Sequence, residues 1–246
     1  MSEPQPILVV GGTHGTGLLI VRLLRQRGQR VRALARDLRR AGSLFDSGVE
    51  IVGGDITKPE TLALALKDAG HVIFTAGCRS GYPVRERRVK AVEYDGLVHT
   101  LAAASQVGFS GRFLYMTSSG VTTQNLATRS LNLWKGNTLV WRRRAEDEIR
   151  MSGVNYTIIR AGVLLNCPGG EHTIEVTQQP LPLAWRFRIA RADVADVFLA
   201  ALEHPNASRA TFEAVWGGHG QPPPLAQLLD ALQGDGDLKT SHYEAA

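Results

Sequence analysis

The chain has 246 residues, of which 43% are hydrophobic and 21% are charged, so it can bury one substantial core and is not a predominantly disordered chain. No apolar run approaches the ~18 residues of a membrane span, and the two cysteines and seven histidines show neither a disulfide framework nor metal-ligand spacing, so we predict no membrane insertion and no metal. Residues 1–150 carry 22 Lys and Arg against 13 Asp and Glu, but these side chains are dispersed without interleaved aromatic residues, which does not favour nucleic-acid binding.

Short apolar runs alternate with longer segments of helical periodicity. The runs typical of strands are residues 7–10, 31–35, 49–52, 71–74, 112–117 and 156–159. The predicted helices are residues 16–27, 57–67, 89–107, 137–151 and, after a triple proline, 225–232. Strands separated by helices imply parallel βαβ units, so the fold class is α/β, a Rossmann-type doubly wound parallel sheet.

A glycine-rich turn follows the first predicted strand. Residues 11–17 read Gly-Gly-Thr-His-Gly-Thr-Gly and lead into a helix. Glycines let the backbone approach a pyrophosphate, and the helix start supplies free N–H groups. The context predicts a dinucleotide site made by Gly11, Thr13, His14, Gly15, Thr16 and Gly17. The alternative is a structural turn that binds no ligand.

The second predicted strand ends in Ala35-Arg36-Asp37. An acid at this place usually accepts a hydrogen bond from the ribose 2′-OH of NAD, whereas a guanidinium can pair with the 2′-phosphate of NADP. Because Arg36 comes first, we predict NADP(H) as the cofactor. Asp37 could instead cap the next short helix.

In this order and spacing, the motifs resemble those of the atypical short-chain dehydrogenase/reductases, specifically the NmrA-like NAD(P)-binding family, over about residues 7–215. Besides the glycine turn and Arg36, the resemblance rests on residues 54–56, 74–77, 112–119, 141–146, 152–162 and 189–195. It implies further cofactor contacts at Asp55, Ile56, Ala76, Gly77, Thr117, Ala161, Gly162 and Val163.

We expect one domain over residues 1–246, with a core of about 6–160, a small C-terminal lobe of substrate-side elements at about 161–234, and a flexible tail at 235–246. Residues 79–90 hold five basic side chains and could form a mobile lid, attract an anionic substrate, or be exposed surface. Seven apolar residues could line a substrate pocket or form the core of the small lobe: Leu131, Leu133, Trp134, Leu181, Leu183, Trp185 and Phe187. The N-terminus lacks a signal peptide, which predicts a cytoplasmic protein, or one in an organelle stroma after processing.

Catalytic residues are harder to define. Enzymes of the wider superfamily use Tyr-x-x-x-Lys on one helix, but no tyrosine here has Lys four residues later. Aligned on Ala145-Glu146, the tyrosine and lysine positions hold Thr138 and Arg142. The candidates that remain are Ser118, Ser119 and Arg142, although the serines could simply satisfy backbone groups where the strand ends.

Two functions are therefore open. The first is an NADPH-dependent oxidoreductase that transfers hydride to a small apolar carbonyl, quinone or flavin-like acceptor without the tyrosine–lysine dyad. The second is a non-catalytic NADP(H)-dependent redox sensor, regulator or assembly factor, for which a protein partner is possible. The missing dyad favours the second function, and the serines and aromatic residues favour the first.

Overall fold

A computed structural model describes residues 4–78, 85–218 and 223–236. Its main sheet has eight strands in the order β3-β2-β1-β4-β5-β6-β10-β8. Their bounds are β1 Ile7–Val10, β2 Val31–Ala35, β3 Val49–Gly53, β4 His71–Phe74, β5 Arg112–Ser118, β6 Asn155–Ala161, β8 Ile174–Thr177 and β10 Ala210–Trp216. Neighbouring strands run parallel except β8, which is antiparallel to β10. A second, two-stranded sheet pairs β7 (Val163–Leu165) with β9 (Arg188–Ala190).

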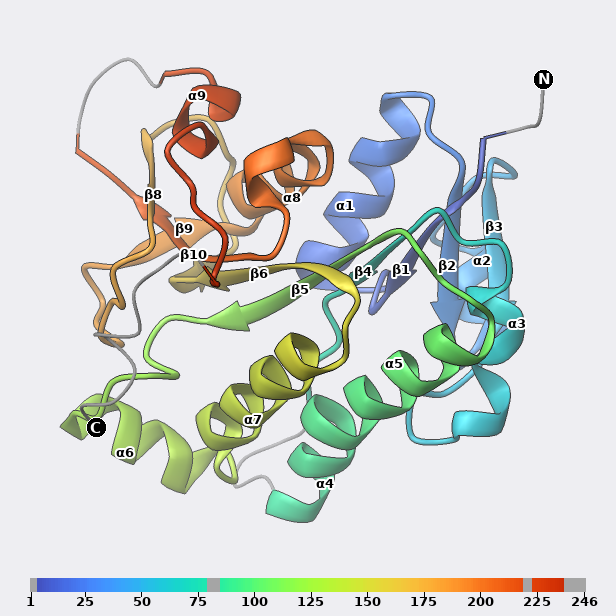
Figure 1. Cartoon of the computed structure of the whole chain (residues 1–246), viewed down its shortest axis with the longest axis horizontal. Helices are drawn as coiled ribbons and strands as arrows, with labels where there is room; N and C mark the ends of the chain where they lie inside the picture. Colours follow the sequence, from blue (N-terminus) through green and yellow to red (C-terminus); the bar gives the residue numbers. More distant parts are fainter. Residues whose placement is uncertain (1–3, 79–84, 219–222, 237–246) are drawn as a thin grey trace.

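Helices cover both faces of the sheet (Figure 1). One face packs against α1 (Gly15–Gln26), α8 (Arg191–Glu203) and α9 (Leu225–Leu229). The other face carries α3 (Ala63–Leu66), α4 (Glu86–Lys90), α5 (Gly96–Gln106) and α7 (Thr138–Met151). Short elements complete the fold: α2 (Leu38–Gly42), η1 (Pro59–Thr61), η2 (Ala91–Asp95), α6 (Leu126–Trp134) and η3 (Pro205–Ala207).

The central strands are buried on both faces, because helices cover each side of them. In β1, Ile7 and Val9 belong to the apolar cluster on the α1 side, whereas Leu8 and Val10 belong to the cluster on the α5 side. This is why β1 is apolar throughout rather than alternating in polarity. The doubly wound parallel architecture predicted from the sequence is confirmed.

Some predicted elements differ from the structure. Residues 57–67 are not one helix but a 3₁₀ turn, η1, followed by the short α3. The predicted helix 89–107 begins earlier, at Glu86, and contains the π-helical turn η2. Asp37 does cap α2, since its side chain accepts a hydrogen bond from Arg40 N at 3.0 Å.

The segment 161–234 is not wholly peripheral. Its strand β10 is the seventh strand of the main sheet and pairs in parallel with β6. Of the predicted tail, Asp235 accepts hydrogen bonds from Tyr156, Thr211 and Arg150, and residues 237–246 lie outside the described part of the chain.

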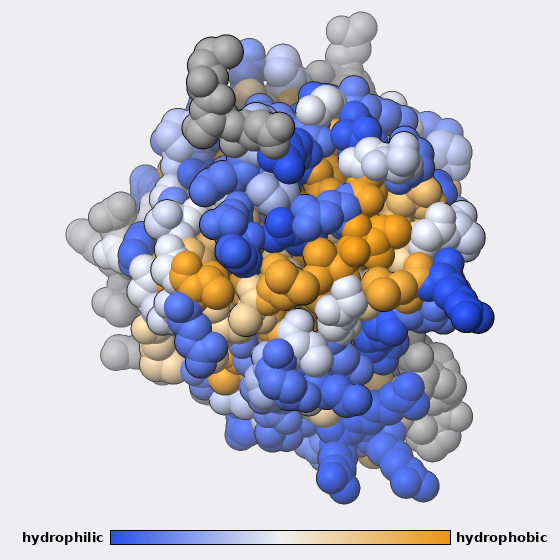
Figure 2. Space-filling model, turned by 90° about the vertical axis from the view of Figure 1, so that its right-hand side faces the viewer, coloured by the Kyte–Doolittle hydropathy of each residue, from blue (hydrophilic) through white to orange (hydrophobic). Residues whose placement is uncertain are grey.

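At the opposite edge of the sheet, the face over α2, β3 and α3 carries an apolar band (Figure 2). Leu38 and Leu64 are exposed members of this face. Leu38 also packs beside Gly53 of β3, the edge strand.

Candidate cofactor and active site

The glycine turn lies at the carboxyl end of β1, against the end of β4. Gly11 has a φ of +89°, and a methyl group placed on it would lie 2.7 Å from Ala76 N. A methyl group on Gly17 would lie 2.4 Å from the carbonyl oxygen of Gly11. Thr75, next to Ala76, donates its hydroxyl to Val10 O at 3.1 Å and fills the remaining space. Only glycine fits at these two positions, so the backbone itself forms the surface of the turn.

The start of α1 has the features of an anion site. Its first turn holds no acidic residue, and the N-cap residue His14 makes no side-chain capping bond. The hydroxyl of Thr16 is buried and has no hydrogen-bond partner in the described residues. The helix dipole and the Thr16 hydroxyl fit the pyrophosphate of a dinucleotide. The His14 ring instead lies 2.9 Å from the hydroxyl of Thr13, measured from Nδ1 to Oγ1.

The end of β2 is followed by a basic and an acidic side chain, Arg36 and Asp37. Arg36 is exposed and makes no hydrogen bond or ion pair in residues 4–78, 85–218 and 223–236. Asp37 caps α2 and is therefore already engaged. The exposed guanidinium of Arg36, and not the Asp37 carboxylate, is therefore available to a ligand at this strand end.

The turn after β3 contains the predicted adenine contacts. The Asp55 carboxylate accepts hydrogen bonds from the Thr57 amide at 2.9 Å and from its hydroxyl at 2.8 Å. Ile56 is buried against Gly96 of α5. Both residues therefore shape the turn, and their contact with a nucleotide stays a prediction.

The two serines at the end of β5, Ser118 and Ser119, have different surroundings. Ser118 is partly exposed and donates its hydroxyl to Ser119 O at 3.1 Å. Ser119 is buried and donates to Glu213 Oε2 at 2.6 Å. Thr117, just before them, is buried with a hydroxyl that has no partner in the described residues. Ser118, which is partly exposed, can thus offer a hydroxyl to a ligand more readily than the buried Ser119 can.

Arg142 lies on α7 and binds a buried acid, Glu93 of η2. Its Nε is 3.0 Å from Glu93 Oε2, and Thr138, one helical turn earlier, donates to the same oxygen. Burial alone would raise the pKa of Glu93, but Arg142 and the hydrogen bonds from Thr138 and Cys78 N hold that pKa below its ordinary value. Burial opposes the charge of Arg142 too, yet Glu93 raises the guanidinium pKa. Arg142 is a fixed cation and cannot relay a proton.

The junction between β6 and β7, residues 161–163, packs against Phe187. Val163 N donates to Phe187 O at 2.8 Å, and a methyl group on Gly162 would lie 2.4 Å from that oxygen. Gly162 is required by this close approach, and the proposed passage of the loop along a nicotinamide stays a prediction. Among the other predicted substrate-side residues, Leu133, Trp134 and Trp185 are 81%, 58% and 66% exposed, so they do not line an enclosed pocket in this structure.

Of the basic segment, residues 79–84 lie outside the described part, and Arg85, Arg87 and Arg88 are exposed on or beside α4.

Three residues near the site were not selected from the sequence. Glu93 is the first. In the sequence it is an acidic residue between the apolar residues Val89 and Leu97 at helical spacing, and in the structure all three are buried. Thr75 at the glycine turn carried no such signal. Arg191, at the start of α8, lies beside the turn, because a methyl group on Gly15 would be 3.8 Å from its Nη1.

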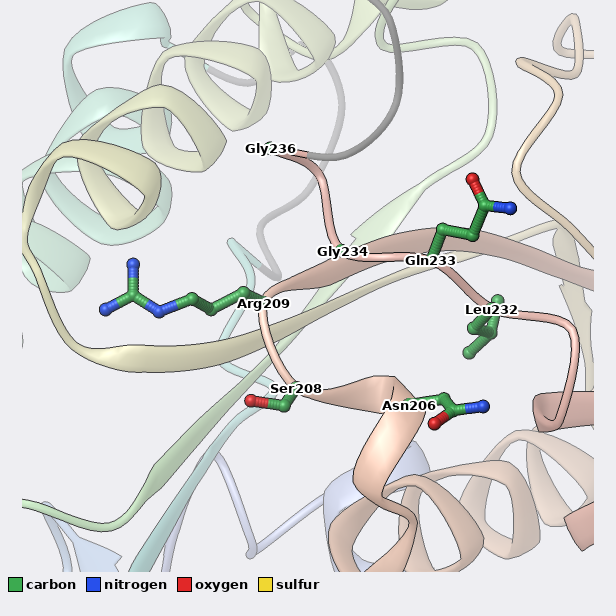
Figure 3. A pocket seen from close by; sticks show the side chains of 7 residues that line it. All are labelled: Asn206, Ser208, Arg209, Leu232, Gln233, Gly234 and Gly236. Atoms are coloured by element: carbon green, nitrogen blue, oxygen red, sulfur yellow. The ribbon is translucent and has the colours of Figure 1, made fainter.

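A cavity of about 500 Å³ lies elsewhere, between η3, the start of β10 and the C-terminal segment (Figure 3). It sits at the amino end of β10, whereas the glycine turn is at the carboxyl ends of the strands. Its side chains satisfy one another or nearby backbone: Ser208 donates to Asn155 at 2.8 Å and Asn206 to Asp230 O at 2.7 Å. It is separate from the cofactor site.

The fold and the site define a Rossmann-type dinucleotide-binding protein. The profile of the NAD(P)H-binding family matches residues 11–205. The chain belongs to this family, which confirms the resemblance to NmrA-like, atypical short-chain dehydrogenase/reductases.

Two relatives span most of the chain. Sanguinarine reductase of Eschscholzia californica is 29% identical over 248 residues, covering 86% of this chain and 89% of the reductase. The photosystem II assembly factor Ycf39 of Synechocystis is 26% identical over 237 residues, covering 93% of this chain and 68% of the factor. The fold is also that of a short-chain dehydrogenase/reductase of Veillonella parvula solved in complex with NADP, with a TM-score of 0.68 and 18% identity over 89% of this chain and 98% of that one.

None of the helices in the described ranges has the length and apolar character that crossing a bilayer requires. The same ranges hold no group of three or more His, Cys, Asp and Glu side chains placed to bind a metal ion.

Proposed function

We propose that this protein is an NADPH-dependent reductase of small apolar carbonyl, quinone or flavin-like acceptors. The observation that carries the proposal is the glycine turn at the start of α1, where the Thr16 hydroxyl has no partner among the described residues, together with Arg36 at the end of the neighbouring strand β2, which is unpaired among the same residues. The backbone of residues 11–17 would hold the pyrophosphate, and Arg36 the 2′-phosphate.

Bound NADPH supplies a hydride at C4 of the nicotinamide and leaves as NADP⁺. Ser118 donates a hydrogen bond to the acceptor oxygen, with Thr117 behind it. Arg142 contacts the cofactor ribose or the acceptor as a fixed cation. The proton that completes the reduction comes from water, because neither Thr138 nor Arg142 is an effective acid, and this favours acceptors such as quinones and flavins over simple ketones.

The second candidate is a non-catalytic NADP(H)-dependent assembly factor or sensor. Two observations favour it: the positions of the usual dyad hold Thr138 and Arg142, and α6 exposes Leu126, Leu133 and Trp134. The relative Ycf39 is an assembly factor. In this role the nucleotide would set the shape of a surface that binds a protein partner.

Cofactor choice is tested by titrating NADPH and NADH into wild type, Arg36→Ala and the control Arg39→Ala, with nucleotide fluorescence as the readout. Losing a guanidinium–phosphate contact should weaken NADPH by about 1.5–3 kcal/mol, or roughly tenfold to a hundredfold, and leave NADH nearly unchanged. Arg39→Ala, also exposed near the end of β2, should bind both as wild type does. Equal losses for both nucleotides in Arg36→Ala would show that Arg36 does not meet a 2′-phosphate.

Catalysis is tested by following NADPH oxidation with a panel of quinones, flavins and ketones. We expect turnover with at least one quinone or flavin, reduced about tenfold or more by Ser118→Ala and unchanged by Arg143→Ala, which pairs with Asp147 on the surface of α7. Tight NADPH binding without oxidation of any acceptor would instead support the assembly-factor role.

A further inference from the structure

The acid Glu93 lies in the π-helical turn η2, between α4 and α5. Its side chain is 4% exposed, so its charge must be compensated inside the protein. Single π-turns within α-helices often occur at functional sites.

Both oxygens of Glu93 are fully used. Oε1 accepts from Cys78 N at 3.0 Å and from Arg142 Nη2 at 3.4 Å. Oε2 accepts from Arg142 Nε at 3.0 Å and from the hydroxyl of Thr138. Glu93 therefore connects the backbone after β4 to α7, two segments that are far apart in sequence.

The result is a defined position for the Arg142 guanidinium. A methyl group on Gly77 would lie 3.2 Å from Arg142 Nη2, so the guanidinium sits directly against the loop after β4. Glu93 takes the Nε and Nη2 donors, and Arg142 Nη1 makes no hydrogen bond in the described part of the chain. That nitrogen can therefore donate to a ligand.

The loop after β4 starts beside the glycine turn, because Ala76 N would be the nearest atom to a methyl group on Gly11. A dinucleotide whose pyrophosphate lies on the turn would extend its second ribose along residues 76–78. None of the hydrogen bonds that Glu93 makes among the described residues goes to the glycine turn. Its effect on a ligand would pass through Arg142 and the Cys78 amide.

We propose that Glu93 is a positioning residue for the nicotinamide half of the bound nucleotide. It holds Arg142 and the Gly77–Cys78 backbone so that Arg142 contacts the nicotinamide ribose. This inference rests on the proposed function, because it requires a dinucleotide at the glycine turn. In this inference, Glu93, Thr138 and Arg142 orient the cofactor and do not transfer a proton.

The test compares two probes. NADPH reaches both halves of the site, whereas adenosine 2′,5′-bisphosphate reaches only the adenine half. Glu93→Gln keeps the side-chain volume but loses the charge, so it should weaken NADPH about tenfold and change the bisphosphate affinity less than about twofold. The control Glu148→Gln removes a carboxylate that binds the neighbouring Tyr94 and should leave both affinities unchanged.

A coupled effect is expected for Arg142. Arg142→Lys keeps a positive charge but loses the two-point contact, so it should also weaken NADPH selectively. The double variant should bind NADPH at most about twofold more weakly than the weaker of the two single variants, because both substitutions disrupt the same contact. If Glu93→Gln fails to fold, the affinities of Arg142→Lys for NADPH and for adenosine 2′,5′-bisphosphate are compared in its place.

The outcomes separate the two proposals. Selective loss of NADPH affinity supports the inference. An unchanged NADPH affinity, or equal losses for the two probes, would overturn it and leave the proposed function standing. Wild type that binds neither probe would overturn both.

Discussion

Two buried carboxylates compete for one guanidinium between α7 and the sheet. Glu146 receives both Nε of Arg160 at 3.0 Å and Nη2 at 2.6 Å. Glu213 of β10 is 3.5 Å from Nη1 of the same arginine. Burial would raise the pKa of Glu146, but Arg160 and Arg150 hold it below its ordinary value. Glu213 has the weaker contact, and burial raises its pKa to about 7.

This difference predicts a specific pH dependence of stability. Between the ordinary glutamate pKa of 4.5 and about 7, the folded protein keeps a proton on Glu213 that the unfolded chain has lost. Stability from this group is therefore present at low pH and falls as pH rises through that window, by on the order of 3 kcal/mol. Glu213→Gln should remove this slope.

The measurement is the free energy of unfolding in urea across that pH range, for wild type and Glu213→Gln. Glu213→Gln also loses the pairing with Arg160, which changes the free energy of unfolding by a constant amount at every pH. The informative quantity is therefore how the difference between the variant and wild type changes with pH. The glutamine variant should gain relative to wild type as the pH rises. Parallel curves would show that Glu213 is already ionised at low pH.

Among the elements, those buried on both faces were predictable. The strand β1 is apolar throughout and β4 is apolar after His71, because helices cover both sides of a parallel sheet. The strand β10 was not recognised, since it carries Thr211 and Glu213 in its core-facing sequence. The polarity of these side chains is compensated by Asp235, Arg160 and Ser119, which come from distant parts of the chain. Such partners leave no local pattern.

The candidate site likewise contains residues that the sequence predicts and residues that it does not. The glycine turn could be predicted because its strand, turn and helix are contiguous, and Arg36 because it ends the next strand. The contact between Glu93 and Arg142 joins residues 49 positions apart. It also depends on the π-turn η2, where helical periodicity shifts by one residue and remains indistinguishable from an ordinary helix in the sequence. The buried hydrogen bond between Ser119 and Glu213 likewise joins residues far apart in the sequence.

At the scale of the whole molecule, the end of the described chain closes the C-terminal half of the sheet. Asp235 is only 10% exposed on its side chain and lies 3.3 Å from Arg150 of α7. It accepts hydrogen bonds from the Tyr156 hydroxyl of β6 at 2.9 Å and from the Thr211 amide of β10 at 2.8 Å. One carboxylate thus joins a helix and two strands that each contact the core.

Asp235→Ala should therefore destabilise the molecule by about 2 kcal/mol or more, because it leaves several partly buried donors without an acceptor. The control Asp230→Ala removes a side chain that is 70% exposed and bonded to His204, and should cost far less. All four tryptophans lie between Trp134 and Trp216, so their fluorescence reports the C-terminal half. NADPH binding, under the proposed function, reports the half that contains the glycine turn.

If the continuous sheet makes the two halves one cooperative unit, both probes should lose their signals at the same urea concentration in Asp235→Ala, lower than in wild type. We expect this result, because β5 and β6 pair over their full lengths and link the halves. A tryptophan transition that moves to lower urea while NADPH binding persists would show that the C-terminal half unfolds separately. The destabilisation would then be confined to β6, β10 and α7, and the single-domain interpretation of the chain would be wrong.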